Sequence, residues 1–260
     1  MGHERVGFLP KTKRWNDLVR QMASDSLSEL PVSSVTAQVL QNVRKRYETL
    51  FRDDAVRTIF TFLVAVSRAC RYDDPQTQLR ESGIALPDQP TLLSIVKALH
   101  QQVPVQDAST EYGQLALSAA ADAIGQWHKQ HSNQLPLFQP SNELFESWRN
   151  LGKGAGFCEL SRLYFGKLTE RYLNYFLDRA ASQVFSDIQK RESFQRKIQS
   201  HIDDVSKHAF ETAKITQSFA AGWFNVHAQN KMPDVKEIDG FLSLAFGKLR
   251  DELRREGEKQ

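Results

Sequence analysis

The stretch FCELSRLYFGKLTERYLNYF, residues 157–176, decides the fold class of this 260-residue chain. Its large apolar side chains recur every three or four residues, a spacing that places them on one face of an α-helix. The pattern continues beyond this stretch, so we expect one long helix from Phe157 to about Ser200. So wide an aromatic stripe is typical of a protein core and predicts the central helix of a bundle. Its members are Phe157, Leu160, Tyr164, Leu168, Tyr172, Phe176, Ala180, Val184 and Ile188.

Helical spacing also dominates the rest of the chain, and alternation with a period of two residues is nearly absent. We therefore expect an all-α fold, a multi-helix bundle of two packed helical halves around that long helix. The halves are residues 1–130 and 142–260, joined by an extended linker at 131–141, and whether they share one core stays open. The other helices predicted cover about 15–23, 35–50, 55–70, 91–100, 109–129, 142–148, 202–227 and 235–256.

The composition, 40% hydrophobic and 25% charged, is typical of a globular protein and excludes a disordered chain. No apolar run approaches the about 18 residues that a membrane-spanning helix needs, and the opening residues do not resemble a secretory signal. Cys70 and Cys158 lie far apart and show no metal-binding spacing, so we expect two buried thiols in a reducing compartment. These features predict a cytoplasmic protein without a membrane partner.

Charge is distributed unevenly along the chain. Residues 1–71 carry a net charge of +5, residues 72–148 a net charge of −6, and residues 149–260 a net charge of +4. Such asymmetry favours association with a charged partner. The positive charge is nevertheless less dense than in a dedicated nucleic-acid-binding protein.

The predicted linker contains a charge-free stretch, HSNQLPLFQP at residues 131–140. Three large apolar side chains in a linker need a groove, either on their own protein or on a partner. The five residues QLPLF resemble the short clamp-binding motif of many bacterial DNA polymerases and repair proteins, in which these side chains enter an apolar groove of the replicative sliding clamp. The resemblance implies partner binding through Gln134, Leu135, Leu137 and Phe138, with Gln134 as the polar anchor. Packing of the three apolar residues on the protein's own core is the alternative.

Basic residues beside an aromatic suggest a second kind of binding. Arginines near an exposed tryptophan can hold a phosphate backbone and stack a base. The alternative is a solvated helix face, because residues 44–46 are consecutive and point in different directions. The candidate nucleic-acid-binding residues are Lys11, Lys13, Arg14, Trp15, Arg44 and Arg46.

Two further patterns suggest ligand sites. His201, Asp204, His208 and Glu211 share one face of a predicted helix and offer the nitrogen and oxygen ligands of a metal site, although the pattern is more typical of a solvated, salt-bridged helix flank. The glycine-rich run at 152–156 precedes a helix, where anions bind, but it lacks the Walker spacing. We expect a tight turn between helices there.

No complete catalytic motif is present; there is no Gly-x-Ser-x-Gly, and no histidine lies near Cys158 in the sequence. The leading hypothesis is a non-enzymatic interaction component of a multiprotein assembly, bacterial and DNA-linked, in genome maintenance or anti-phage defence. Its partners would be other protein subunits, a sliding clamp or another DNA-bound protein, and we expect no cofactor. The alternatives are direct nucleic-acid binding through the basic helices and a metal-dependent enzyme that uses the His/Asp/Glu face.

Overall fold

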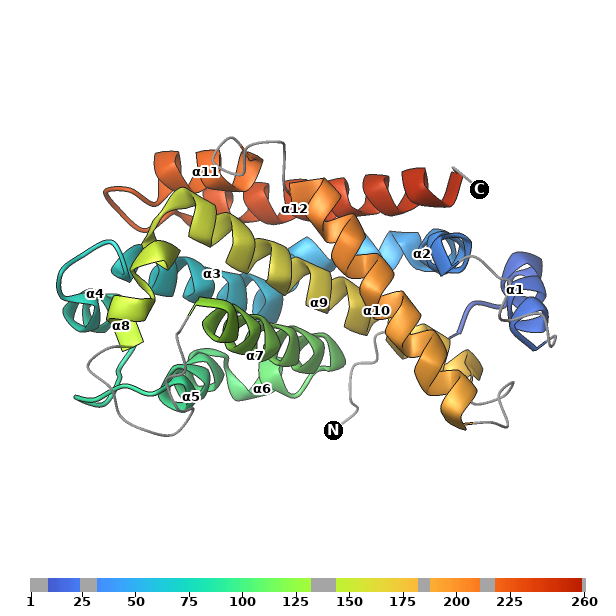
Figure 1. The fold of residues 1–260 in the computed structure, drawn as a ribbon, viewed down its shortest axis with the longest axis horizontal. Coiled ribbons are helices and arrows are strands. Elements are labelled where there is room, and N and C mark those ends of the chain that lie inside the picture. The colour runs from blue at the N-terminus through green and yellow to red at the C-terminus, as the bar shows by residue number, and fades with distance from the viewer. Residues whose placement is uncertain (1–8, 24–31, 132–143, 182–187, 211–217, 259–260) are drawn as a thin grey trace.

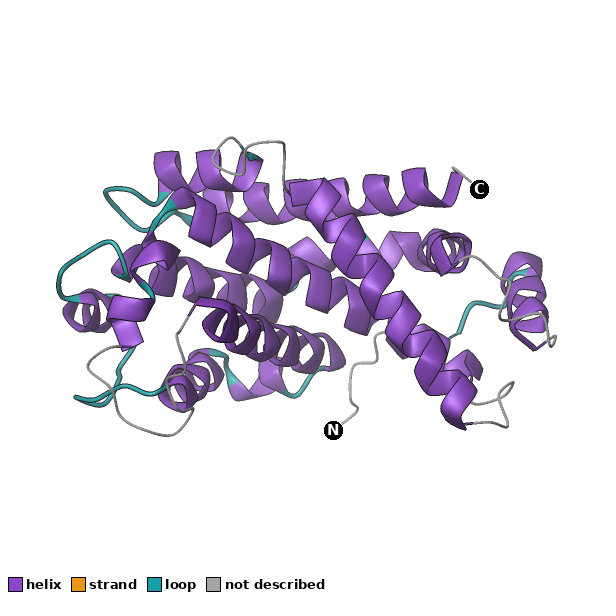
Figure 2. Ribbon diagram, in the orientation of Figure 1, coloured by secondary structure: helices purple, strands orange, loops and turns teal. Residues whose placement is uncertain are grey.

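The computed structural model describes residues 9–23, 32–131, 144–181, 188–210 and 218–258. These ranges contain helices and loops but no strand, which confirms the all-α prediction (Figures 1 and 2). The α-helices are α1 (Lys13–Ala23), α2 (Val32–Tyr47), α3 (Asp54–Ala69), α4 (Pro75–Glu81), α5 (Leu92–Gln102), α6 (Val105–Ala108), α7 (Glu111–His131), α8 (Leu144–Ser147), α9 (Gly154–Ala181), α10 (Ile188–Phe210), α11 (Phe219–His227) and α12 (Val235–Glu258); two 3-10 helices are η2 (Leu50–Arg52) and η3 (Arg149–Gly152).

Helix α9 is the central element of the bundle. It crosses the middle of the molecule and packs against α7, α10 and α11, and also against α2 and α3 (Figure 1). The predicted stripe is buried along it from Phe157 to Phe176, and Leu177 extends the buried face by one residue. A helix covered on several sides needs apolar residues around much of its circumference, which is what this stretch supplies.

The prediction of one helix from Phe157 to Ser200 is wrong. Helix α9 ends at Ala181, and α10 begins at Ile188 and packs back along α9 in the opposite direction. Two side-chain contacts show the antiparallel order, since Arg162 reaches Asp203 whereas Asp178 reaches Gln195. Ile188, counted in the stripe, is 74% exposed.

The expected helix 202–227 is also divided. Residues 202–210 form the end of α10, whose own buried stripe contains Phe194, Ile198, Ile202 and Val205. Helix α11 begins at Phe219, where the Ser218 hydroxyl accepts a hydrogen bond from the backbone N–H of Ala221. A serine in this position satisfies one of the free amides of the first turn.

Other helix starts are fixed by similar caps. The carboxylate of Asp53 accepts the N–H of Val56 at the start of α3. Thr91 and Ser94 exchange backbone and side-chain hydrogen bonds at the start of α5, which forms a capping box. Helices α4 and α6 were not predicted, because each is a short segment next to proline and shows too few periodic positions.

Part of the core is a group of five neighbouring rings, called here the aromatic centre: Phe60, Phe157, Phe165, Trp223 and Phe241. They come from α3, α9, α11 and α12. The rings of Phe60 and Phe241 stack with their centroids 4.9 Å apart, and those of Trp223 and Phe241 lie 4.7 Å apart. Because α3 belongs to the first half of the chain and the other helices to the second, both halves contribute to one continuous buried cluster.

Both cysteines are buried and carry free thiols, as predicted. None of the helices in the described ranges combines the length and the hydropathy needed to cross a bilayer.

Candidate functional site

Helices α1 and α2 lie at one end of the elongated molecule, where the chain also ends after α12 (Figure 1). Residues 9–12 run beside α2 and are tied to it by the hydroxyl of Thr12, which donates to Oδ1 of Asn42 at 2.7 Å. An open hollow of about 780 Å³ lies between them. Its lining includes Leu9, Pro10, Lys11, Arg44 and Lys45.

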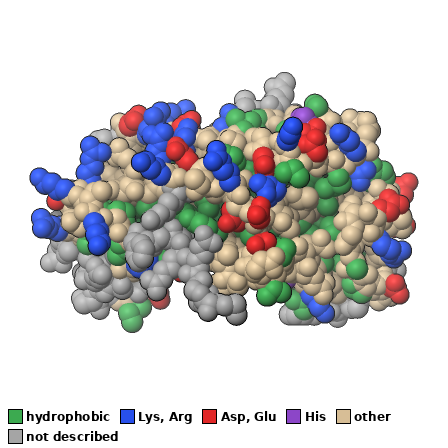
Figure 3. All heavy atoms as spheres, turned by 180° about the vertical axis from the view of Figure 1, so that it is seen from behind, with side chains coloured by type: hydrophobic (Ala, Val, Ile, Leu, Met, Phe, Trp, Pro, Cys, Tyr) green, Lys and Arg blue, Asp and Glu red, His purple; other side chains and the backbone are tan. Residues whose placement is uncertain are grey.

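This end of the molecule carries mostly positive charge. Residues 9–23 and 32–47 include a single acid, Asp17, and the acid that follows them, Glu48, pairs with Arg44. In the view from behind, lysine and arginine side chains gather over the side where α1 and α2 lie (Figure 3). The basic residues, called here the α1–α2 surface, are Lys11, Lys13, Arg14, Arg20, Arg44 and Lys45.

Much of this charge is not neutralised within the described residues. Lys11, Lys13, Arg14 and Lys45 are exposed, and none of them forms an ion pair with another described residue. Arg44 donates its Nε to the carboxylate of Glu48 at 2.7 Å. Nothing is described of the Arg46 side chain.

Glu48 is shared between two guanidinium groups. Arg250, on α12, also donates to the same oxygen of Glu48 at 2.7 Å. The hydrogen bond from Arg44 is the main reason why the pKa of the Glu48 carboxyl lies below its usual value. One carboxylate between two arginines leaves a net positive charge, so this contact orients Arg44 without cancelling the charge of the surface.

The structure contradicts the expectation that Trp15 is an exposed stacking platform. Its side chain is 3% exposed and packs in the core together with Leu18, which lies one turn further along α1. The hydroxyl oxygen of Thr12 accepts the N–H of Trp15 and caps the helix in this orientation. Because Trp15 and Leu18 are spaced i and i+3, both point toward the core, whereas Lys13 and Arg14 face the solvent. Among the exposed large apolar residues in the described ranges, the one aromatic is Tyr72.

The predicted partner-binding residues, Gln134, Leu135, Leu137 and Phe138, lie outside the described residues, so their role stays a prediction. The helices on either side are well anchored. His131 closes α7 by stacking on Trp127, with a centroid distance of 4.1 Å, and its Nε2 lies 3.2 Å from Glu159. On the other side, Trp148 is buried and donates its indole N–H to Nδ1 of His128 at 3.0 Å.

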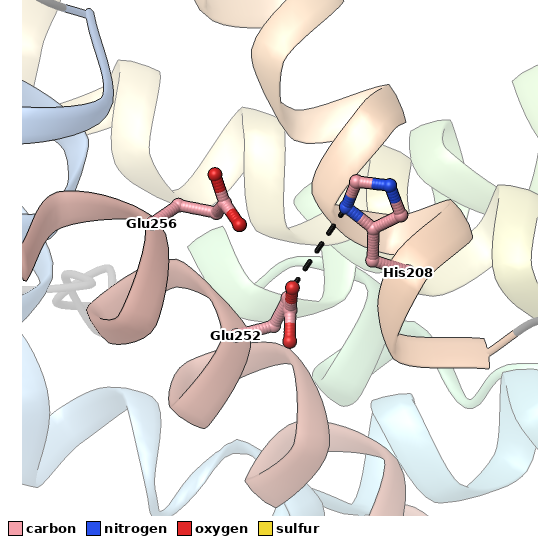
Figure 4. Close-up of side chains that lie close together, drawn as sticks. All are labelled: His208, Glu252 and Glu256. Carbon is pink, nitrogen blue, oxygen red and sulfur yellow. Dashed lines mark ion pairs between the residues drawn. The ribbon is translucent and has the colours of Figure 1, made fainter. Parts of the chain in front are cut away.

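Of the predicted metal ligands, Glu211 lies outside the described residues, and the structure gives His208 partners that the sequence did not indicate. Figure 4 shows His208 on α10 facing Glu252 and Glu256 on α12. One ligand atom from each lies within 4.8 Å of the other two, the one such group of three in the described ranges. His201 and Asp204 are not members of this group, and Asp204 lies 3.7 Å from the ammonium of Lys207.

The sequence does not indicate Glu252 and Glu256 as ligands, because His208 is 44 residues or more away from them in the chain. Their i,i+4 spacing on an amphipathic helix was the available signal, but such pairs are common on solvated faces. Only the packing of α10 against α12 brings them to His208.

The glycine-rich run lies at a close crossing of backbones, in agreement with the predicted tight turn between helices. A Cβ on Gly152 would lie 2.7 Å from the backbone of Cys70 and Arg71, and one on Gly156 would lie 2.1 Å from the carbonyl oxygen of Asn150. Arg71 donates to the carbonyl of Gly152 at 2.7 Å and places its guanidinium 4.3 Å from the ring centroid of Phe224. The glycines thus let η3 approach the end of α3.

Comparison of the chain with protein-family models, with curated proteins and with solved structures found no match.

Proposed function

We propose that this protein is a non-enzymatic component of a DNA-linked assembly and binds nucleic acid through the phosphate contacts of the α1–α2 surface. The observation that carries the proposal is the charge of this surface, where four exposed cations, Lys11, Lys13, Arg14 and Lys45, have no ion-pair partner among the described residues and lie around an open hollow. Lys11, Arg44 and Lys45 line that hollow from two chain segments that are far apart in sequence. A surface built from separate segments is fixed by the fold, unlike a basic run in a flexible tail.

The predicted mode of binding follows from the side chains present. Lysine and arginine contact phosphates without reading the base sequence. Because Trp15 is buried, base stacking on this residue is not part of the mode. Each neutralised phosphate of a duplex lowers the slope of log K against log salt by about 0.9, so four contacts from Lys11, Lys13, Arg14 and Lys45 predict a slope of about −3 to −4.

The test compares two triple variants of the full chain by fluorescence anisotropy with labelled duplex DNA and single-stranded RNA, between about 50 and about 200 mM salt. The first variant is Lys11→Glu/Lys13→Glu/Lys45→Glu. The control is Lys97→Glu/Lys129→Glu/Lys236→Glu, which makes the same change in net charge at exposed lysines elsewhere. We expect the first to weaken binding at least about tenfold and to flatten the salt dependence, and the control to bind within about twofold of the wild type.

Two outcomes would contradict the proposal. One is the absence of binding by the wild type at low salt. The other is an equal loss in both triple variants, which would show a response to net charge alone. Circular dichroism of each variant establishes that it is folded before its affinity is compared.

The linker resemblance supports a second candidate function, binding of a sliding clamp. The described residues on either side of this stretch are held by the His131 and Trp148 contacts. Surface plasmon resonance on a purified bacterial clamp, with wild type and Leu137→Ala/Phe138→Ala, is the direct measurement. Loss of binding by a folded double variant supports the proposal. Unfolding of the variant would mean that these side chains belong to the core.

A further inference from the structure

His208, Glu252 and Glu256 meet at the seam between α10 and α12. In Figure 4 the imidazole and the two carboxylates face the same space between the helices. Nδ1 of His208 lies 3.8 Å from Oε1 of Glu252, which is beyond hydrogen-bonding distance. The group therefore brings one nitrogen and two carboxylate donors together without joining the histidine to either glutamate by a hydrogen bond that the structure describes.

The two glutamates bring two negative charges close together at this seam. Glu252 and Glu256 are one turn apart on α12, and like charges at this spacing repel each other. The side chain of Glu252 is only 11% exposed, and burial makes a carboxylate more dependent on a positive partner. Arg255 donates to Oε1 of Glu252 from the rim of the group. A cation between the two carboxylates would turn their repulsion into a shared attraction.

We propose that His208, Glu252 and Glu256 bind a divalent first-row transition-metal ion, for which Zn²⁺ is the reference ion. One imidazole with two carboxylates is a donor set that suits Zn²⁺, and three protein ligands leave a fourth position for water. Ligands in a tetrahedral zinc site lie about 3.3 Å apart, and the three donors lie within 4.8 Å of one another, so they must approach by up to about 1.5 Å. Both glutamates have flexible side chains, and that of His208 is 61% exposed and free to turn.

A second observation points to the same seam. His201 lies two turns before His208 on α10, and its Nε2 is buried without a hydrogen-bond partner among the described residues. Burial lowers the pKa of the His201 imidazole, and the negative charge of Glu256 acts in the opposite direction. The α10–α12 seam thus gathers two imidazoles and two carboxylates, the types of side chain from which helical bundles build metal sites.

Metal binding would compete with an existing contact of Glu252. Arg255 donates to Oε1 of Glu252, the same oxygen that lies nearest to His208. The Arg255 side chain is 59% exposed and can turn into solvent. A consequence specific to this site is that removing the guanidinium strengthens metal binding, because the metal no longer competes with it.

The experiment is an isothermal calorimetric titration in which ZnCl₂ is added to the chelator-treated full chain near neutral pH. We expect one equivalent to bind the wild type, with His208→Ala and Glu256→Gln weakening binding at least about tenfold. Arg255→Ala should bind more tightly than the wild type. The matched control is His227→Ala, since His227 forms another His–Glu pair, with its Nδ1 2.9 Å from Glu237; this variant should bind like the wild type.

Cobalt gives a readout that does not depend on heat. A Co²⁺ ion with His208 as ligand would show the visible absorption of a low-coordinate site, and His208→Ala should lose it. The proposal is wrong if the wild type binds no stoichiometric metal, if His208→Ala binds as the wild type does, or if His227→Ala loses binding equally. The metal titration is independent of the nucleic-acid experiment, because that experiment substitutes different residues, Lys11, Lys13 and Lys45.

Discussion

The aromatic centre and the α1–α2 surface differ in what their side chains contact. In the aromatic centre, rings from four helices touch one another, with centroid separations between 4.7 and 6.4 Å. On the α1–α2 surface, four cations are exposed and unpaired within the described part of the chain. The first region therefore stabilises the fold, and the second is available to a partner.

The energies of the two regions differ in the same way. Full burial of a phenylalanine contributes about 1.5 to 3 kcal/mol relative to its exposure, before any cavity effect. An exposed charged side chain contributes about 0 to 1 kcal/mol to stability. Substitutions in the centre should thus reduce stability without a direct effect on binding, whereas substitutions on the surface should do the reverse.

The largest effect on stability is expected for Phe60→Ala. Phe60 is fully buried on α3 and contacts rings of α9, α11 and α12, so its removal opens a cavity shared by four helices. We expect a loss of about 3 to 5 kcal/mol in the free energy of unfolding, measured by urea denaturation. Leu93→Ala, at a side chain that is 57% exposed on α5, is the control and should change it by less than about 0.5 kcal/mol. A loss below about 1 kcal/mol for Phe60→Ala would refute the structural role given to the aromatic centre.

A smaller loss of stability is expected for a substitution at Gly156, where two backbone segments cross beside the aromatic centre. In Gly156→Ala the new methyl would lie 2.1 Å from the carbonyl oxygen of Asn150, so η3 or α9 must shift. Forcing extra volume into such a place destabilises by about 1 to 3 kcal/mol. Gly240→Ala is the matched control, because nothing lies within 4 Å of its added methyl. Its improved helix propensity should stabilise by up to about 1 kcal/mol, so thermal melts should shift in opposite directions.

The contact between α7 and Trp148 provides a pH-dependent effect. Burial lowers the pKa of the His128 imidazole, and the neutral ring accepts the indole N–H of Trp148. Since the unfolded chain binds this proton more readily, the stability from His128 is complete above the unfolded pKa of about 6.5 and is lost as the pH falls through the folded pKa. Between about pH 7.5 and about pH 5, urea denaturation should show a larger decrease in the free energy of unfolding for the wild type than for His128→Gln, because the glutamine side chain does not titrate.

Equal pH dependence of the two proteins would show that His128 keeps its ordinary pKa. All the other histidines of the chain are common to both proteins. The difference between the two proteins therefore isolates His128.

Much of the fold could be predicted because helical periodicity is a local property. The spacing of Val39, Val43 and Tyr47 gave the buried face of α2, and the stripe from Phe157 to Phe176 gave that of α9. Periodicity does not say where the chain reverses. The apolar spacing runs on past Ala181, and the pattern alone cannot distinguish one long helix from two that pack side by side.

The candidate sites depended more on tertiary contacts. The burial of Trp15 does not follow from its exposed basic neighbours, because helical geometry turns adjacent residues in different directions. The basic residues themselves were identified, but the hollow between residues 9–12 and α2 was not. The meeting of His208 with Glu252 and Glu256 was missed, because it depends on which helix packs against α10.

The smallest effect on stability is expected for Lys45→Ala on the α1–α2 surface. Lys45 is exposed on α2 and pairs with no described residue, so its removal should change the free energy of unfolding by less than about 0.5 kcal/mol. The same substitution should weaken duplex binding about equally for all sequences and make the salt slope less negative by about 0.9, as for the loss of one phosphate contact. Anisotropy and urea denaturation on one preparation measure both quantities. If Lys45→Ala instead lowered stability by more than about 1 kcal/mol and left the salt slope unchanged, the positive charge of α2 would serve the fold, and the division between a stabilising centre and a binding end would fail.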